Sequence, residues 1–178
     1  MVVSETTKKH KAEAPAKLKF SIYVCSTSRY QKIRKDQSIE DVSGDLIESF
    51  LKKAGHEIVL RRLIPDDKSL IEKCVREVLA SPEIDVAVFC GGTGIASSDV
   101  TIETVSPFLE KTLPGFGEIF RRLSFDEIGS AAVLSRALAG VAKGKVFFCI
   151  PGSPNSVRLC FEKLILPEAA HIVKHARE

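Results

Sequence analysis

The chain has 178 residues, of which 44% are hydrophobic and 28% charged, a composition typical of one globular domain with a full hydrophobic core. The formal net charge of +3 comes from the first 19 residues, because the remainder balances 21 basic against 21 acidic side chains. This balance argues against a nucleic-acid-binding surface, and no apolar run is long enough to span a bilayer.

The first 17 residues are predicted to form a flexible basic tail ahead of a single domain at 18–178. The lysines of this tail are not followed by an apolar core of seven or more residues, so the segment fits neither a secretory signal nor a membrane anchor. An arm that contacts another subunit is the alternative interpretation. The five cysteines form no Cys-x-x-Cys pair and lie mostly in apolar runs, which favours a reducing, cytoplasmic setting.

The first half of the domain alternates between strand and helix patterns. Residues 18–27 predict a strand, and the polar stretch 28–42 predicts a long mobile loop. A helix capped by Ser43 and ended by Gly55 follows, then a strand over 56–64 and a helix over 68–80, whose apolar residues recur at helical spacing.

The second half continues the alternation. Residues 84–90 predict a third strand, and helices are expected at 100–109, from 114 through 122, and at 131–139. Residues 145–150 predict a last strand before a C-terminal helix. Strands that alternate with helices indicate an α/β fold, a three-layer α/β/α sandwich with a mostly parallel central sheet. Ligands of such folds gather at the carboxyl ends of the strands.

The loop that follows the third strand reads Gly91-Gly92-Thr93-Gly94 and is suited to bind phosphate. Three glycines in four positions let the backbone turn sharply and bring its N–H groups against an anion. The spacing matches neither the Walker motif nor the dinucleotide fingerprint, so a plain strand-to-helix turn is the alternative. A second turn loop, 151–156, follows the last strand and is expected at the same edge of the sheet.

Two carboxylates, Asp66 and Asp99, are expected beside these loops. Each by itself is also explained as the N-cap of the helix that follows it. Together they predict a metal ion at the site, because clustered carboxylates repel one another unless a cation joins them.

Two other sets of residues receive no role in the predicted site. Cys90 adjoins the glycine loop but has no histidine nearby in sequence to activate it as a nucleophile. His171 and His175 lie four residues apart on a predicted helix, a spacing that can chelate a metal ion, although histidines near a helix C-terminus more often complement its dipole.

From residue 19 onward the chain resembles the molybdopterin-binding proteins of molybdenum cofactor biosynthesis, of the MoaB and MogA type. The order and spacing of seven pieces carry this resemblance: Thr27-Ser28-Arg29, Asp41-Val42-Ser43-Gly44, Ile64-Pro65-Asp66-Asp67, Gly91-Gly92-Thr93-Gly94 with Asp99-Val100-Thr101, Pro114-Gly115-Phe116-Gly117-Glu118, Leu134-Ser135-Arg136 and Pro151-Gly152-Ser153-Pro154. The segment 120–129 is more similar to the MoaB branch.

The resemblance implies the molybdopterin-binding fold and an adenylyltransferase activity, in which AMP passes from ATP to the terminal phosphate of molybdopterin and pyrophosphate is released. It implies that Asp66 and Asp99 are catalytic and hold Mg²⁺. The cofactor-binding and substrate-binding residues that it implies are Gly91, Gly92, Thr93, Gly94, Glu118, Ser135, Arg136, Gly152, Ser153 and Pro154.

The resemblance also implies a homotrimer or homohexamer, and the metal-inserting enzyme of the pathway as a further candidate partner. One departure is visible, since Ser98 stands where the family commonly has a basic residue before the second aspartate. Glu118 is also explained as an acid near a helix start, and Arg136 as half of a surface ion pair. A molybdopterin-binding or carrier protein without turnover is therefore the alternative function, and a flavodoxin-like nucleotide-binding regulator explains fewer of the motifs.

Overall fold

The computed structural model describes residues 13–178, so the predicted tail lies outside the described residues up to residue 12. The last residues of that predicted segment contact the domain, since Lys17 Nζ lies 3.0 Å from Glu57 Oε2. Glu13 Oε2 similarly accepts from Lys174 Nζ at 2.8 Å. These two ion pairs connect the segment before the first strand to the sheet and to the C-terminal helix.

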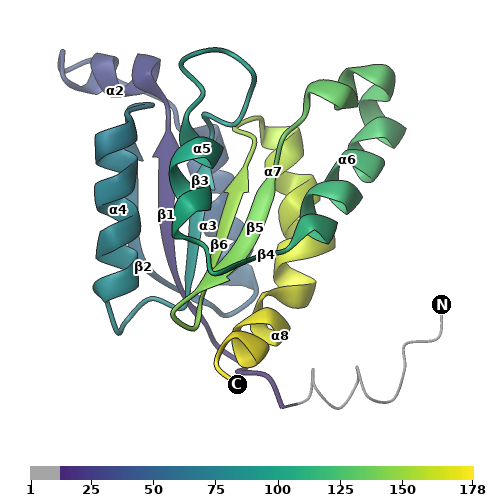
Figure 1. Cartoon of the computed structure of the whole chain (residues 1–178). Coiled ribbons are helices and arrows are strands. Elements are labelled where there is room, and N and C mark those ends of the chain that lie inside the picture. Colours follow the sequence, from purple (N-terminus) through teal and green to yellow (C-terminus); the bar gives the residue numbers. More distant parts are fainter. Residues whose placement is uncertain (1–12) are drawn as a thin grey trace.

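A six-stranded sheet in the order β2-β1-β3-β6-β5-β4 forms the centre of the molecule (Figure 1). The first four strands in this order run parallel, and the last two pair antiparallel at one edge. The strands are β1 (Lys19–Cys25), β2 (Glu57–Ile64), β3 (Val86–Cys90), β4 (Lys111–Thr112), β5 (Leu138–Ala142) and β6 (Lys145–Ile150).

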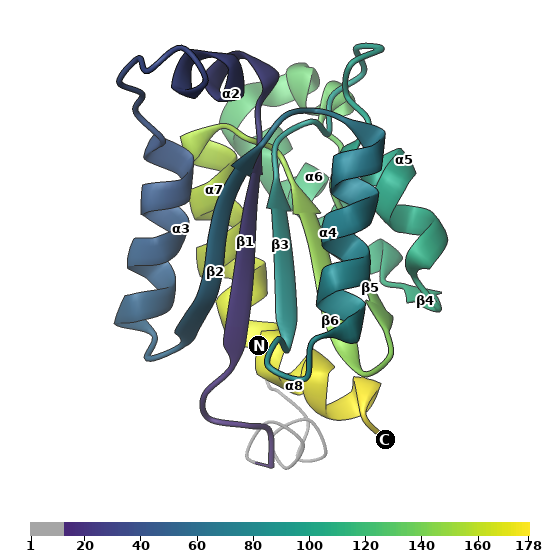
Figure 2. The ribbon, with the colours of Figure 1, turned by 90° about the vertical axis from the view of Figure 1, so that its left-hand side faces the viewer.

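Helices cover both faces of this sheet, which confirms the predicted three-layer α/β/α sandwich (Figure 2). One face packs against α4 and α5, and the other against α3, α6, α7 and α8. The helices are α2 (Thr27–Ile33), α3 (Val42–Lys53), α4 (Lys68–Ala80), α5 (Thr101–Val105), α6 (Pro114–Ile128), α7 (Pro154–Cys160) and α8 (Leu166–Ala176), with short helical segments η1 (Ser106–Phe108), η2 (Gly129–Leu134) and η3 (Phe161–Ile165).

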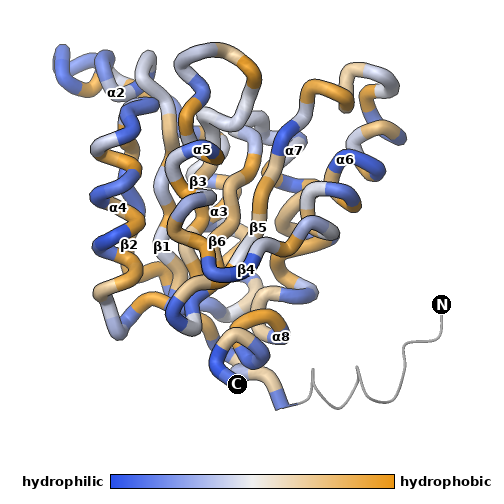
Figure 3. Tube along the Cα trace, viewed as in Figure 1, coloured by the Kyte–Doolittle hydropathy of each residue, from blue (hydrophilic) through white to orange (hydrophobic). Residues whose placement is uncertain are grey.

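The two cores follow from the side-chain alternation of the central strands. Phe20 and Ile22 of β1 face the α3 side, whereas Tyr23 faces the α4 side, and all three are fully buried. Figure 3 shows β5 and β6 mostly in hydrophobic colours and α2 mostly in hydrophilic ones. Each such buried side chain contributes roughly 1.5–3 kcal/mol, so the sheet is a rigid base for the loops at its edge.

Helix α4 and strand β6 occupy the predicted residues, 68–80 and 145–150. The predicted loop at 28–42 was wrong in part, because α2 lies within it. This helix has no buried residue, so its sequence carries no apolar stripe to reveal it.

The predicted helix over 131–139 was also wrong. The chain there forms η2 and then enters β5, which pairs antiparallel with β6. Pairing with a distant strand overrides the local helical preference of the alanines and leucines. At its other side β5 pairs with the two-residue strand β4, which the sequence also did not predict.

Candidate functional site

The carboxyl ends of the four parallel strands lie at one edge of the sheet, and their loops meet there. Cys25 is in register with Ile64, and Cys90 with Ile150. Two backbone bonds extend the ladders past the strand ends, since Ser26 N donates to Ile64 O and Gly91 N to Ile150 O, each at 2.9 Å. This edge includes the position where the strand order reverses around β1, which is the usual ligand site of such sheets.

A cavity of about 540 Å³ opens at this edge. Nine of the predicted site residues line it: Gly91, Gly92, Thr93, Gly94, Asp99, Ser135, Arg136, Gly152 and Ser153. Several further lining residues have no predicted role in the site, among them Cys25, Ser26, Ser28, Ile128, Leu134 and Ser156. The structure therefore brings together both glycine-containing loops, as the predicted convergence requires, and adds the segment before β5.

The glycine loop presents amides to the cavity, with one correction to the prediction. Gly91 N–H is committed to Ile150 O, so it does not serve a ligand. Gly91 has a structural role instead. Its φ is +106°, and an added Cβ would lie 2.3 Å from Cys25 O, so the position accommodates no side chain. Among the described residues, the amides of Gly92, Thr93 and Gly94 donate to no protein acceptor, which leaves these three available to a ligand.

Asp66 lies directly behind the glycine loop. Its Oδ2 accepts from Thr27 N at 2.8 Å and from Thr27 Oγ1 at 2.9 Å. Its Oδ1 is buried and has no hydrogen-bond partner, and the same holds for Oγ1 of Thr101. Each of these two oxygens lies 2.5 Å from the position that a Cβ of Gly92 would occupy. The predicted alternative of a helix cap is wrong for Asp66, because the neighbouring Asp67 accepts from Leu70 N and caps α4.

Asp99 borders the cavity from the far end of the same loop. Its Oδ2 accepts from Ala96 N at 2.9 Å, which closes the turn after Gly94. The cap of α5 is Val100 rather than Asp99, so the capping alternative is wrong here too. Both carboxylates thus serve the glycine loop.

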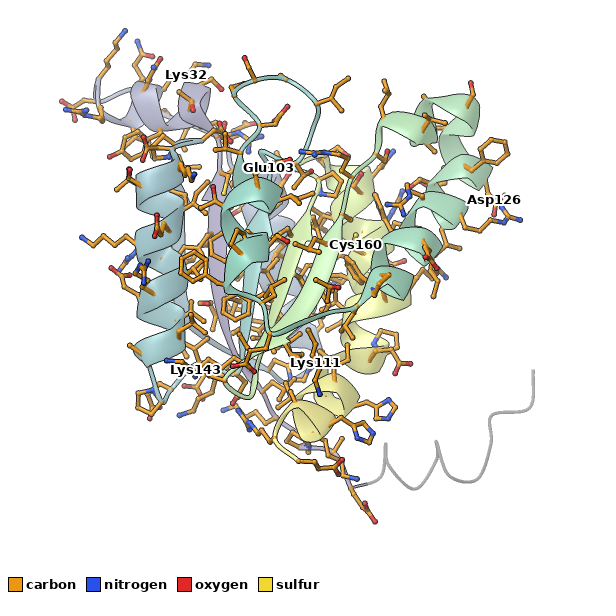
Figure 4. All side chains as sticks on the ribbon, in the orientation of Figure 1. Lys32, Glu103, Lys111, Asp126, Lys143 and Cys160 are labelled. Atoms are coloured by element: carbon orange, nitrogen blue, oxygen red, sulfur yellow. The ribbon has the colours of Figure 1, made fainter. Side chains whose placement is uncertain are left out.

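Arg136 joins the loop to α5. Its Nε donates to Thr93 O at 2.9 Å, and its NH1 and NH2 donate to the two Glu103 oxygens at 2.6 and 3.2 Å. The guanidinium holds the pKa of Glu103 below its usual range. Glu103 is labelled on α5 in Figure 4. The ion pair that the sequence analysis gave as an alternative is therefore present, and it holds Arg136 at the cavity wall.

A second arginine, Arg29 of α2, also lines the cavity. Its NH1 lies 3.4 Å from Asp41 Oδ1, and Asp41 in turn caps α3 by accepting from Gly44 N. Arg61 NH2 donates to the other Asp41 oxygen at 2.7 Å. This network fixes the start of α3 beside the site.

The loop 151–156 is held from two directions. Buried Ser43 of α3 donates to Gly152 O at 2.7 Å, and Gly152 packs so closely on Gly91 that its added Cβ would lie 3.2 Å from Gly91 Cα. Ser153 Oγ accepts from Ser156 N and caps α7. Pro154, the first residue of α7, lines an adjoining hollow of about 360 Å³ between α6 and α7 rather than the main cavity.

Glu118 is a predicted site residue that the structure does not bring into this arrangement. It is exposed in the second turn of α6 and does not line the cavity. It lies beyond the first helical turn, so the alternative of an acid at the helix start does not describe it either. Its role in binding remains a prediction.

The cavity thiols are not built for nucleophilic catalysis. Burial raises the pKa of Cys90 to about 12 and raises that of Cys25 as well. Both thiols are therefore protonated near neutral pH, and thiols rather than thiolates are poor nucleophiles. This agrees with the sequence analysis, which assigned Cys90 no catalytic role.

The arrangement is that of an α/β protein with three amides free of protein acceptors, two arginines and Asp99 around one cavity, and Asp66 behind the glycine loop. Asp66 Oδ1 fits a hard cation, because a buried carboxylate oxygen without a donor is costly. Among residues 13–178 no group of three metal-ligating side chains occurs, so protein atoms alone do not complete a coordination shell. A cation here would share its ligands between protein, water and a bound phosphate, as Mg²⁺ commonly does.

Comparisons with known proteins assign this chain to a family. The family model of the probable molybdopterin-binding domain matches residues 21–171. The molybdenum cofactor biosynthesis protein B of Bacillus subtilis is 43% identical over 174 residues, which cover 97% of this chain and 98% of that protein. The molybdopterin adenylyltransferase of Pyrococcus furiosus is 43% identical over 173 residues, covering 95% and 97%.

A solved structure agrees with these sequences. The crystal structure of the tungsten cofactor synthesizing protein MoaB from Pyrococcus furiosus superposes with a TM-score of 0.80 at 41% identity, covering 93% of this chain and all of that one. The chain belongs to the molybdopterin-binding domain family of molybdenum cofactor biosynthesis. Within residues 13–178, no helix has the length and apolar character needed to cross a membrane.

Proposed function

We propose that this protein transfers AMP from ATP to the terminal phosphate of molybdopterin and releases pyrophosphate. The observation that carries the proposal is the single cavity at which two glycine-containing loops, Asp99 and two arginines meet, with Asp66 directly behind. Its volume of about 540 Å³ lies within the usual range for small-molecule sites. Relatives at 40–43% identity that carry the name molybdopterin adenylyltransferase support the same activity.

The reaction joins two phosphate groups, so the protein must align them and offset their charge. An oxygen of the molybdopterin phosphate attacks the α-phosphorus of ATP, a new P–O–P bond forms, and the bond to the bridging oxygen of pyrophosphate breaks. We assign the amides of Gly92, Thr93 and Gly94 to the phosphate oxygens, together with the guanidinium groups of Arg29 and Arg136. We assign Ser135, Ser153 and the adjoining hollow at Pro154 to the pterin and its phosphate.

Mg²⁺ is the cation that we propose at the two aspartates. Asp66 Oδ1 and an oxygen of Asp99 would hold it, and when bound it supplies positive charge against the phosphate oxygens. The unpartnered Oδ1 supports this assignment, because Thr27 already satisfies the other oxygen of Asp66. Thr27 thereby fixes which oxygen faces the glycine loop.

The direct test incubates the protein with molybdopterin, ATP and Mg²⁺ and measures adenylylated pterin and pyrophosphate. We expect the double variant Asp66→Asn, Asp99→Asn to lose turnover by about 100-fold or more, the order found when a transition-state stabiliser is removed. Asp67→Asn is the matched control, because it makes the same chemical change one residue away and asparagine still caps a helix.

The same assay decides against the proposal if pterin binds to the wild type and no product forms. That result would assign the protein to the alternative function, a molybdopterin-binding or carrier protein. Ser98 is the residue to replace first in that case, with Ser98→Arg restoring the basic side chain that the family commonly has there. Product from the wild type would show that Arg29 and Arg136 suffice as cavity cations.

We also propose that the protein forms a homo-oligomer, a trimer or a hexamer. Large apolar side chains on α6 and η2 support this, because they are at least half exposed: Ile119, Phe125, Ile128, Val133 and Leu134. Exposed large apolar side chains on two consecutive elements favour an interaction surface, and a second copy of the chain is the occupant that we propose. Light scattering coupled to gel filtration tests this, and a monomer at micromolar concentration would contradict it.

Finally, we propose a cytoplasmic location. All five cysteines are buried free thiols in the structure, which fits a compartment that keeps thiols reduced. Fractionation of cells that express the protein from its own promoter, followed by immunoblotting, tests the location, and recovery outside the cytoplasmic fraction would contradict it.

A further inference from the structure

Positive charge near the cavity is concentrated on one short segment. Residues 27–35 carry four basic side chains and no acidic one, whereas the chain as a whole from residue 20 onward balances the two. The segment consists of α2 and the turn after it, and α2 buries none of its residues. Packing therefore does not explain its composition. Figure 4 labels Lys32 on this helix, at the edge of the sheet where the cavity opens.

Lys32 shares the side of α2 that lines the cavity. Ser28 and Arg29 are lining residues, and Lys32 follows them by four and three positions. Residues at these two spacings are neighbours on one face of a helix. Arg34 and Lys35 instead line a separate shallow hollow of about 300 Å³. Of the basic side chains on this segment, Lys32 is therefore the one that extends the row begun by Arg29.

The charge of Lys32 is not shared with a carboxylate. Lys32 is exposed, and within residues 13–178 its ammonium group has no acidic partner. Arg29 lies 3.4 Å from Asp41, whose other oxygen Arg61 already holds at 2.7 Å. Arg136 is bound through both of its terminal nitrogens to one glutamate. Lys32 thus offers a compact point charge that a phosphate group does not have to win from another anion.

The loops around the cavity follow the order of the strands. Helix α2 follows β1, the glycine loop follows β3, the loop 151–156 follows β6, and η2 precedes β5. Figure 1 accordingly shows α2 and the end of α6 on opposite sides of this edge. Ile128 and Leu134 line the cavity at the η2 end, where the hollow between α6 and α7 adjoins it. The apolar end suits a ring, and the basic end suits an anion.

The direction of the reaction follows from these two ends. In phosphoryl-type transfer the attacking and leaving oxygens lie roughly in line through the phosphorus atom. With the pterin at the η2 end, its phosphate attacks the α-phosphorus of ATP from that side, and the leaving group departs toward α2.

We propose that Lys32, together with Arg29, binds the β- and γ-phosphates of ATP and the pyrophosphate formed from them. As the bond between the α-phosphorus and the bridging oxygen breaks, its electron pair stays on that oxygen, and the ammonium and guanidinium groups offset the added negative charge. Neither side chain gives up a proton in this step. The inference rests on the proposed AMP transfer and specifies where its leaving group is held.

The start of α2 fixes this pair relative to the carboxylates. Thr27 is the first residue of the helix, and its N and Oγ1 donate to Asp66 Oδ2 at 2.8 and 2.9 Å. Because α2 buries no residue, these two bonds take the place of packing in positioning it. The pyrophosphate site and the proposed cation site are therefore held by one element.

The test measures binding of pyrophosphate, ATP and AMP, each with Mg²⁺, to the full-length protein by isothermal titration calorimetry without molybdopterin. We expect Lys32→Gln to weaken pyrophosphate and ATP binding by about 10-fold each, the value of one hydrogen bond to a charged group, and AMP binding by less than about 2-fold. Lys32→Arg keeps the charge and should retain most of the affinity. Lys35→Gln is the matched control, because it makes the same change in the same segment at a side chain that lines the other hollow.

Three results would overturn the inference. One is equal pyrophosphate affinity in Lys32→Gln and Lys35→Gln, and another is absence of pyrophosphate binding to the wild type. The third is a parallel loss of AMP affinity in Lys32→Gln, which would assign Lys32 to the α-phosphate. Failure of the proposed function is distinguishable from all three, because it appears as absence of adenylylated pterin from the wild type, in an assay that involves no variant of Lys32. Circular dichroism of each variant checks that the fold is retained.

Discussion

Replacing Gly92 with alanine tests the geometry of the candidate site most directly. Gly92 has a φ of +60°, and an added Cβ would lie 2.5 Å from both Asp66 Oδ1 and Thr101 Oγ1. A left-handed backbone costs a non-glycine residue roughly 1–2 kcal/mol, and forcing an atom into occupied space costs roughly 1–3 kcal/mol. We therefore expect Gly92→Ala to lower the free energy of unfolding by about 2–5 kcal/mol and to abolish AMP transfer.

Gly55→Ala is the matched control for this prediction. Gly55 has a φ of +78° in the turn after α3, but its added Cβ would meet no atom within 4 Å. The Gly55→Ala variant should lose only the stability that the left-handed backbone costs a non-glycine residue, and it should retain full AMP transfer. Urea unfolding measures the difference of about 1–3 kcal/mol as a shift of roughly 0.5–1.5 M in midpoint. Equal midpoints for the two variants, with activity retained in Gly92→Ala, would refute the placement of both oxygens.

Three further predictions concern the support of the site. Ser43→Ala should lower the free energy of unfolding by about 1 kcal/mol and raise the KM for molybdopterin, because it leaves Gly152 O without its donor at 2.7 Å. Urea unfolding measures the first effect, and initial rates measure the second. Glu103→Gln should lower the free energy of unfolding at pH 7 by about 0.5–1 kcal/mol. Arg136 lowers the pKa of Glu103 in the folded protein. The ion pair therefore stabilises the fold fully at a pH above the usual glutamate pKa, and this stabilisation is lost as the pH falls through the lowered pKa of the folded state. Unfolding at pH 7 and below pH 4 should show this difference shrink. A thiol reagent at pH 8 should modify none of the five buried cysteines in the native protein and all five in denaturant.

The elements that could be predicted are those whose sequence contains their own packing pattern. Helix α4 has a complete apolar stripe, and β6 is buried along its whole length, so each is recognisable without its neighbours. In β5, buried and partly buried residues alternate only in part, so its sequence does not reveal a strand. It forms a strand because it pairs antiparallel with β6. Helix α2 buries no residue, so no periodicity in the sequence could reveal it.

The candidate site divides in a similar way. Both glycine-containing loops were predictable, because carboxyl ends of parallel strands must lie at one edge. The sequence singled out Asp66 but could not settle whether it caps the following helix, since two adjacent acids before a helix are equally able to cap it. Only the structure shows that Asp67 caps α4 while Asp66 turns toward Gly92. The exposure of Glu118 depends likewise on how α6 rotates against the sheet.

The charges of the cavity explain why its backbone must carry much of the binding. Arg136 is engaged by both oxygens of Glu103, and Arg29 lies beside Asp41, so each guanidinium meets a ligand with its charge already partly offset. Ser98 adds no cation on the side of Asp99. In the proposed reaction a triphosphate would therefore depend on the three free amides of the glycine loop and on a cation at the carboxylates. These two contributions would act together, because the space that Gly92 leaves beside Asp66 fixes both.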